Sequence, residues 1–181
     1  SLIIGAILVI IFTKEEFVQT QEKKTNGLKT ITNILQIKGF PLILAIYFLI
    51  YALASMVTPI LPLFVEKLTS DSTKAISLTG YIIAAGGLIG GIASLIMGKL
   101  GDRIGHSKIL LFSLLATGIL SIPQSFAGSV SVLFYERCLF YFAAGGIIPA
   151  VNVMVKRFIS HDKIGSAYGL TSSVTCLGIG L

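Results

Sequence analysis

Four long apolar runs constrain this chain most, because each is long enough to cross a lipid bilayer as a helix. The bilayer core is about 30 Å thick and requires about 20 apolar residues at about 1.5 Å each. The runs occupy residues 40–64, 76–97, 109–126 and 130–155. Only 12% of the 181 residues are charged, whereas soluble domains have about 25%. The sequence therefore predicts an all-α, polytopic membrane protein that has the lipid bilayer as its main partner.

Two further apolar runs lie at the ends of the chain and are incomplete. Residues 2–12 would cover about half of the bilayer core. Residues 164–181 end without a polar flank. A signal peptide is not expected at the start, because no basic stretch precedes the first run and no small-residue cleavage site follows it. We expect four complete and two truncated membrane helices, in a chain that is cut at both ends.

The distribution of Lys and Arg predicts the orientation, since cytoplasmic connectors carry an excess of both residues. Alternate connectors, residues 13–39, 98–108 and 156–163, hold eleven of them. The connectors on the other side, residues 65–75 and 127–129, hold two. The first group is therefore predicted to be cytoplasmic.

Several functional classes have no support in the sequence. The basic residues lie in separate connectors rather than on one stripe, which argues against nucleic acid as a partner. His106 and His161 have no second ligand at metal-binding spacing, and Cys138 and Cys176 lie inside apolar runs as small hydrophobic residues. No nucleophile with a base or pair of carboxylates appears. We expect no enzyme activity, no metal and no cofactor.

Residues 98–108 are the most specific segment, and they predict a tight cytoplasmic turn between two antiparallel helices. They read Gly-Lys-Leu-Gly-Asp-Arg-Ile-Gly-His-Ser-Lys. Gly98 and Gly105 permit close approach and left-handed backbone angles. Asp102 can bind the positive N-terminal end of a neighbouring helix, and Arg103 and Lys108 can pair with carboxylates or lipid phosphates.

This segment resembles the signature loop of the major facilitator superfamily, Gly-x-x-x-Asp-Arg-x-Gly, found between the second and third helices of each six-helix half. Gly101 stands where the family favours Ala, and His106 and Ser107 stand where it favours basic residues. The resemblance implies a secondary transporter that works by alternating access. It also implies that Asp102 caps a helix of the other half as part of a cytoplasmic latch.

The order of the segments assigns this loop to the second half of such a transporter. Residues 1–12 would end helix six, residues 13–39 would form the cytoplasmic central loop, and residues 40–181 would form helices seven to eleven. Residues 12–17 and 59–63 resemble the multidrug-efflux branch. Residues 133–152 resemble its helix ten, with Phe140 and Tyr141 in place of the usual Gln and Gly, and residues 165–170 resemble the start of helix eleven.

The first long run has a polar face that could line a substrate cavity. Tyr47, Tyr51, Ser55 and Thr58 follow one another at helical spacing. The face could instead serve ordinary helix packing. Pro59 and Pro62, in the same run, each remove a backbone donor and either allow a bend or shape the end of the helix.

The second long run is rich in small residues, which predicts close packing of helices. It contains Gly86, Gly87, Gly90, Gly91, Ser94 and Gly98.

Glu136 and Arg137 are charged residues inside a predicted span, where charges cost several kcal/mol unless they find partners or water. Arg137 shares a helical stripe with Tyr141, Gly145, Asn152 and Lys156. Tyr141 and Asn152 are therefore further candidates for a cavity lining. The stripe could line the route of a substrate or proton, or it could lock helices together near the outer surface.

The expected function is proton-coupled efflux of drugs or other amphipathic small molecules across the cell membrane of a bacterium. The chain would need the missing first-half helices and would not transport alone. Uptake of a sugar or metabolite is one alternative. A non-transporting membrane module that pairs with a separately encoded first half is another.

Overall fold

The computed structural model describes residues 27–160 and 163–180, and every regular element in this part of the chain is a helix. The predicted all-α architecture is confirmed. The helices are α2 (Gly27–Leu35), α3 (Phe40–Thr69), α4 (Ser72–Ile104), α5 (His106–Gln124), α6 (Val130–Ala144), α7 (Ile147–Phe158) and α8 (Ile164–Ile179). Residues 1–12, expected to end a preceding helix, lie outside the described residues.

Four helices of the described part are long and apolar enough to cross a bilayer. They are Phe40–Thr69, Ser72–Ile104, His106–Gln124 and Val130–Phe158. These correspond to the four predicted spans, although α3 and α4 continue beyond their apolar runs. Residues 13–39 were expected to form a loop, but the described part of this segment contains α2, whose Ile34 is fully buried.

Local sequence signals mark where helices begin and where the chain reverses direction. Asp71 begins α4 by accepting hydrogen bonds from the backbone N–H groups of Thr73 (3.1 Å) and Lys74 (3.2 Å). Ser129 caps α6 in the same way. Gly105 separates α4 from α5 with a φ of 101°, which an L side chain rarely adopts.

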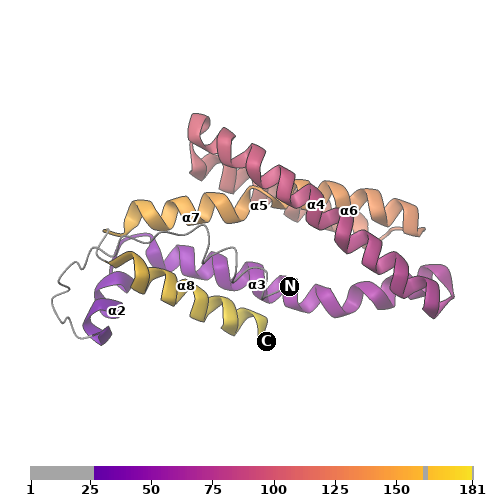
Figure 1. The fold of residues 1–181 in the computed structure, drawn as a ribbon, viewed down its shortest axis with the longest axis horizontal. Coiled ribbons are helices and arrows are strands. Elements are labelled where there is room, and N and C mark those ends of the chain that lie inside the picture. Colours follow the sequence, from indigo (N-terminus) through magenta and orange to yellow (C-terminus); the bar gives the residue numbers. More distant parts are fainter. Residues whose placement is uncertain (1–26, 161–162, 181) are drawn as a thin grey trace, which may run out of the picture.

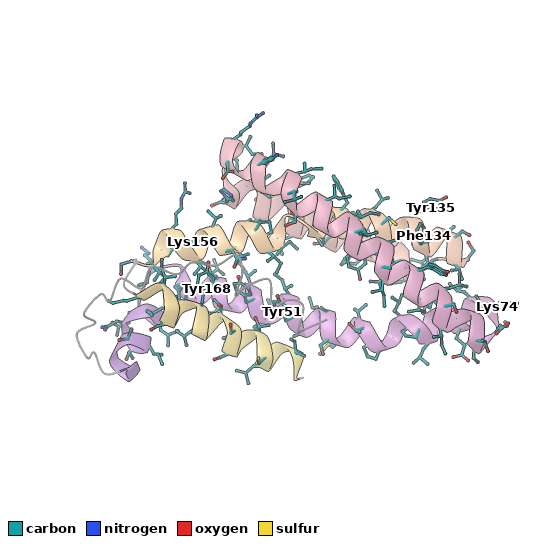
Figure 2. The ribbon with its side chains drawn as sticks, viewed as in Figure 1. Tyr51, Lys74, Phe134, Tyr135, Lys156 and Tyr168 are labelled. Atoms are coloured by element: carbon teal, nitrogen blue, oxygen red, sulfur yellow. The ribbon has the colours of Figure 1, made fainter. Side chains whose placement is uncertain are left out.

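The helices form an elongated bundle in which α8 lies beside the first part of α3 and α4 crosses the bundle obliquely (Figure 1). Helices α6 and α7 follow each other along nearly one line (Figure 1). Lys74 and Lys156 lie near opposite ends of the molecule (Figure 2), as the predicted sidedness requires. Large apolar side chains such as Leu88 and Leu95 remain about 70% exposed, which suits a lipid-facing surface.

The predicted single span over residues 130–155 is interrupted at residues 145–146, between α6 and α7. Pro149 explains the interruption, because it has no N–H to donate to the carbonyl of Gly145, four residues earlier. Gly145 and Gly146 also pack too closely for side chains. A Cβ on Gly145 would lie 2.6 Å from the Cβ of Ala93, and one on Gly146 would collide with Ser113.

Candidate cavity between three helices

Two of the predicted cavity residues on α3 and one on α7 meet at the same place. The Tyr47 hydroxyl donates a 2.7 Å hydrogen bond to Asn152 Oδ1. The Tyr47 and Tyr51 rings are nearly parallel, with an interplanar angle of 4° and centroids 6.3 Å apart. The hydrogen bond joins residues 105 positions apart in the sequence, and so it fixes α3 against α7.

Helix α8 completes this site with a wall that the sequence analysis did not assign. The hollow between α3, α7 and α8 has a volume of about 390 Å³. Tyr47, Tyr51, Ile148 and Asn152 line it together with Tyr168, Thr171, Ser172, Thr175 and Cys176. We name it the tyrosine cavity. Tyr51 and Tyr168 lie on the facing helices α3 and α8 (Figure 2).

The sequence does contain a signal for the wall formed by α8, namely polar residues at helical spacing. Tyr168, Thr171 and Thr175 follow one another at intervals of three and four on α8 and share one face. Cys176 was expected to be a buried hydrophobic residue, but it is exposed and free, whereas Cys138 is only partly exposed. The cavity wall therefore combines three phenol rings with an amide, several hydroxyls and a thiol.

With the orientation that the charges predict, the tyrosine cavity extends from the cytoplasmic side to about the middle of the membrane. Tyr47 is seven residues and Tyr51 eleven residues from Phe40, where α3 begins. At about 1.5 Å per residue these positions are roughly 10 and 17 Å along the helix. Asn152 lies a similar distance before the end of α7, which is also cytoplasmic by the distribution of charge.

The remaining candidates on the polar face of α3 do not reach the cavity. Thr58 is exposed, and its hydroxyl donates to the carbonyl of Ala54 within the same helix (2.7 Å). Ser55 donates to the carbonyl of Ile179 on α8 (2.9 Å). Helix α3 continues through Pro59 and Pro62, which therefore lie inside it rather than at its end.

Tyr141 packs between α6 and α4 rather than in the cavity. Its ring occupies the space that a side chain on Gly86 would need. Of the predicted stripe from Arg137 to Lys156, Asn152 reaches the cavity while Tyr141, on the preceding helix α6, does not.

Glu136 and Arg137 do not form an ion pair with each other within the described residues. Glu136 Oε2 and Arg137 Nε are buried and have no hydrogen-bond partner among the side chains and backbone described here. The Arg137 guanidinium carbon lies 5.8 Å from the centroid of the Phe140 ring. Neither residue lines the tyrosine cavity.

The signature segment forms the turn between α4 and α5. Gly105 has the expected positive φ, but Gly98 lies inside α4 and a Cβ there would meet nothing within 4 Å. Asp102 contacts His106 on its own hairpin, and Arg103 and Lys108 are exposed.

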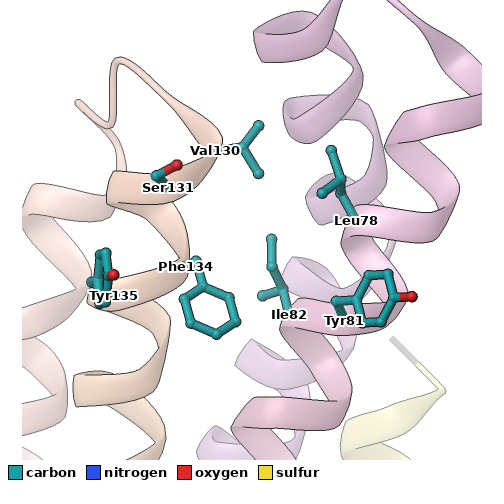
Figure 3. Close-up of a pocket in the computed structure, with 7 residues that line it drawn as sticks. All are labelled: Leu78, Tyr81, Ile82, Val130, Ser131, Phe134 and Tyr135. Atoms are coloured by element: carbon teal, nitrogen blue, oxygen red, sulfur yellow. The ribbon is translucent and has the colours of Figure 1, made fainter.

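A second hollow of about 390 Å³ lies between α4 and α6, near their outer ends. Its walls are mainly apolar, and Phe134 points toward Ile82 across the gap (Figure 3). Tyr81 and Tyr135 on its rim are 70% and 69% exposed. Tyrosines are enriched at membrane–water interfaces, so this hollow fits the lipid boundary better than a polar ligand.

Comparison with known proteins agrees with this architecture. The chain is 25% identical over 179 residues to a protein from Lactococcus lactis subsp. lactis, the multi-drug resistance efflux pump PmrA homolog. It is 29% identical over 178 residues to the multidrug resistance protein MdtG of Citrobacter koseri, and 27% identical over 180 residues to that of Salmonella typhimurium. Each alignment covers 98% of this chain and 44% of the relative.

The chain thus spans less than half the length of these curated relatives. No solved structure matches it significantly. The relatives confirm the predicted resemblance to the multidrug-efflux branch. The family description that matches residues 1–181 is that of the Major Facilitator Superfamily, and the chain belongs to this family.

Proposed function

We propose that this chain forms the second half of a proton-coupled exporter of drugs or other amphipathic small molecules in a bacterial plasma membrane. The tyrosine cavity carries the proposal, because one hollow joins aromatic and polar groups of three helices. Aromatic faces attract organic cations with about 0.5–2 kcal/mol. The three named relatives are multidrug efflux or resistance proteins, which supports the same class of substrate.

The depth of the cavity supports entry of substrate from the cytoplasmic side. Tyr47 lies in the part of α3 nearer its predicted cytoplasmic end, and Tyr51 lies about one turn deeper. An amphipathic molecule that has partitioned into the inner leaflet would meet this part of the bundle first. Alternating access would then require the half described here to rock against another half around the bound molecule.

One face of α4 supports docking of a first half. Its residues are small, exposed or partly exposed, and recur at intervals of four, three, four and seven. They are Gly80, Ala84, Gly87, Gly91 and Gly98. A Cβ on any of these four glycines would meet nothing within 4 Å. Small residues let helices approach closely in lipid, and Asp102 continues this face at the cytoplasmic end of α4.

Ethidium efflux would test the proposal. The host cells would lack their own efflux pumps and would carry the native gene of this protein. We expect efflux that a protonophore abolishes. Tyr51→Ala should reduce it by roughly 2- to 30-fold, which corresponds to the loss of one cation–aromatic contact. Tyr81→Ala removes an exposed tyrosine outside the tyrosine cavity and should have little effect. Equal loss in both variants would contradict a role for the cavity.

Uptake of a sugar or metabolite is the second candidate, because α8 adds the hydroxyls of Thr171, Ser172 and Thr175 to the lining. Under this alternative, cells would show no ethidium efflux and would accumulate a hydrophilic solute. A non-transporting module would show neither activity. Such a module would still copurify with a separate protein of five or six membrane helices through the small-residue face of α4.

A further inference from the structure

The turn between α4 and α5 contains a histidine that is buried although it begins a helix at the cytoplasmic end of the bundle. His106 is 7% exposed. Its imidazole lies directly against Gly101, so that a Cβ on Gly101 would be 2.8 Å from His106 Cδ2 and 2.9 Å from His106 Nε2. Real Cβ atoms essentially never approach other atoms this closely. The ring therefore occupies the space that an alanine at position 101 would fill.

The same ring faces the carboxylate of the signature loop. His106 Nε2 lies 3.5 Å from Asp102 Oδ1. The two side chains differ sharply in exposure, with 9% of the imidazole side chain exposed against 75% of the aspartate side chain. The buried ring thus has less freedom to move than the exposed carboxylate.

The backbone around the ring is also fixed. The carbonyl of Gly101 accepts a 2.9 Å hydrogen bond from the N–H of Gly105, and the carbonyl of Gly105 accepts one from the N–H of Lys108 (3.1 Å). Gly101 therefore cannot move away from the imidazole without breaking the bond that ends α4. A larger residue at position 101 would have to displace the ring instead.

We propose that Gly101 and His106 form a matched pair in which the imidazole positions the Asp102 carboxylate at the cytoplasmic end of α4. The geometry explains why position 101 carries no side chain beside this ring. His106 is a positioning residue, since it acts through Asp102. The pairing of Gly101 and His106 lies within the hairpin of α4 and α5 and does not depend on which molecule is transported.

A double-mutant cycle on the purified chain in detergent micelles tests the matched pair. Overpacking would be partly offset by the better helix propensity of alanine, so Gly101→Ala should raise the unfolding equilibrium constant by up to about 30-fold. The same substitution should cause no rise in a His106→Ala background, because the ring is no longer there. Gly98→Ala, in open space on the same helix, is the matched control and should lower the unfolding equilibrium constant by up to about 5-fold. If Gly101→Ala alone does not fold, recovery of folding in the double variant is the expected result.

Carbon NMR of the Asp102 carboxyl group tests the positioning role, which packing alone would not reproduce. The three-bond coupling between its carboxyl carbon and the backbone nitrogen should report one fixed rotamer in the parent and averaged rotamers in His106→Ala, because the ring 3.5 Å from Asp102 Oδ1 is then missing.

Two results would overturn the proposal. One is an equal effect of Gly101→Ala with and without His106, or a double variant that stays unfolded. The other is an Asp102 side-chain coupling that is the same in the parent and in His106→Ala. Neither measurement uses transport, so a failure of the proposed efflux function would leave both results interpretable.

Discussion

The crossing of α8 over α3 allows a quantitative test of how the tyrosine cavity is built. Gly178 lies at the contact, where a Cβ would be 2.9 Å from the backbone oxygen of Phe48 and 3.1 Å from the backbone nitrogen of Ala52. Both neighbours are main-chain atoms of α3, so no side-chain rotation can relieve the contact. Gly178→Ala must therefore separate the two helices that form opposite walls of the cavity.

The expected change in unfolding free energy follows from two opposing effects. Alanine in place of glycine inside a helix stabilises it by about 1 kcal/mol. Overpacking at a close contact costs about 1–3 kcal/mol. Gly178→Ala should therefore lower the unfolding free energy by up to about 2 kcal/mol. Gly169→Ala lies on the same helix with nothing within 4 Å of its Cβ, and should raise it by up to about 1 kcal/mol.

Unfolding in mixed micelles of increasing sodium dodecyl sulfate would measure both variants. Far-ultraviolet circular dichroism is the suitable signal, because the chain has no tryptophan. We expect the two variants to differ by about 1–3 kcal/mol, with Gly178→Ala the less stable. Equal stability of the two variants, or a more stable Gly178→Ala, would refute the close crossing of α3 and α8.

Three further substitutions test single features. Tyr47→Phe leaves Asn152 Oδ1 without its donor and should lower the unfolding free energy by about 1 kcal/mol, whereas Tyr51→Phe should not; equal losses would contradict the bond between α3 and α7. Pro149→Ala restores a backbone donor and should slow amide hydrogen exchange at the junction of α6 and α7; unchanged exchange would show that proline does not cause the break. The pKa of Asp71 is held below its usual value by hydrogen bonds from the backbone N–H and the side chain of Lys74, and also from the Thr73 N–H. Desolvation opposes this with a smaller effect. The stability that Asp71 contributes is present above its unfolded pKa and is lost as pH falls through the lowered folded pKa, so Asp71→Asn should flatten the acid dependence of the unfolding midpoint; an unchanged dependence would contradict this.

The membrane helices could be predicted from the sequence because their signal is strong and local. Apolar runs of bilayer length leave few alternatives to a helix, and polar connectors with caps such as Asp71 mark where the chain turns. The ends were less accurate, since α3 and α4 continue as helices beyond their apolar residues. The break before Ile147 was missed although Pro149 was visible, because apolar composition alone does not distinguish one helix from two in line.

The candidate site could be predicted only in part, because it depends on which helices become neighbours. Helical spacing grouped Tyr47 with Tyr51, but it could not show that Asn152 lies opposite them or that Thr58 turns away. The contribution of α8 could have been found from its polar face. The fit of His106 against Gly101 could not have been predicted from the sequence, since it depends on the path of the backbone through the turn.

We propose that the tyrosine cavity binds the transported molecule, and the thiol of Cys176 gives the most direct test. Cys138→Ser leaves Cys176 as the single thiol of the chain, exposed in the cavity wall. N-ethylmaleimide should modify it in membranes, and ethidium should slow the reaction several-fold, while Cys138 in a Cys176→Ser variant should show no protection. A Cys176 reaction rate that ethidium leaves unchanged, in cells that export ethidium through this protein, would contradict the account.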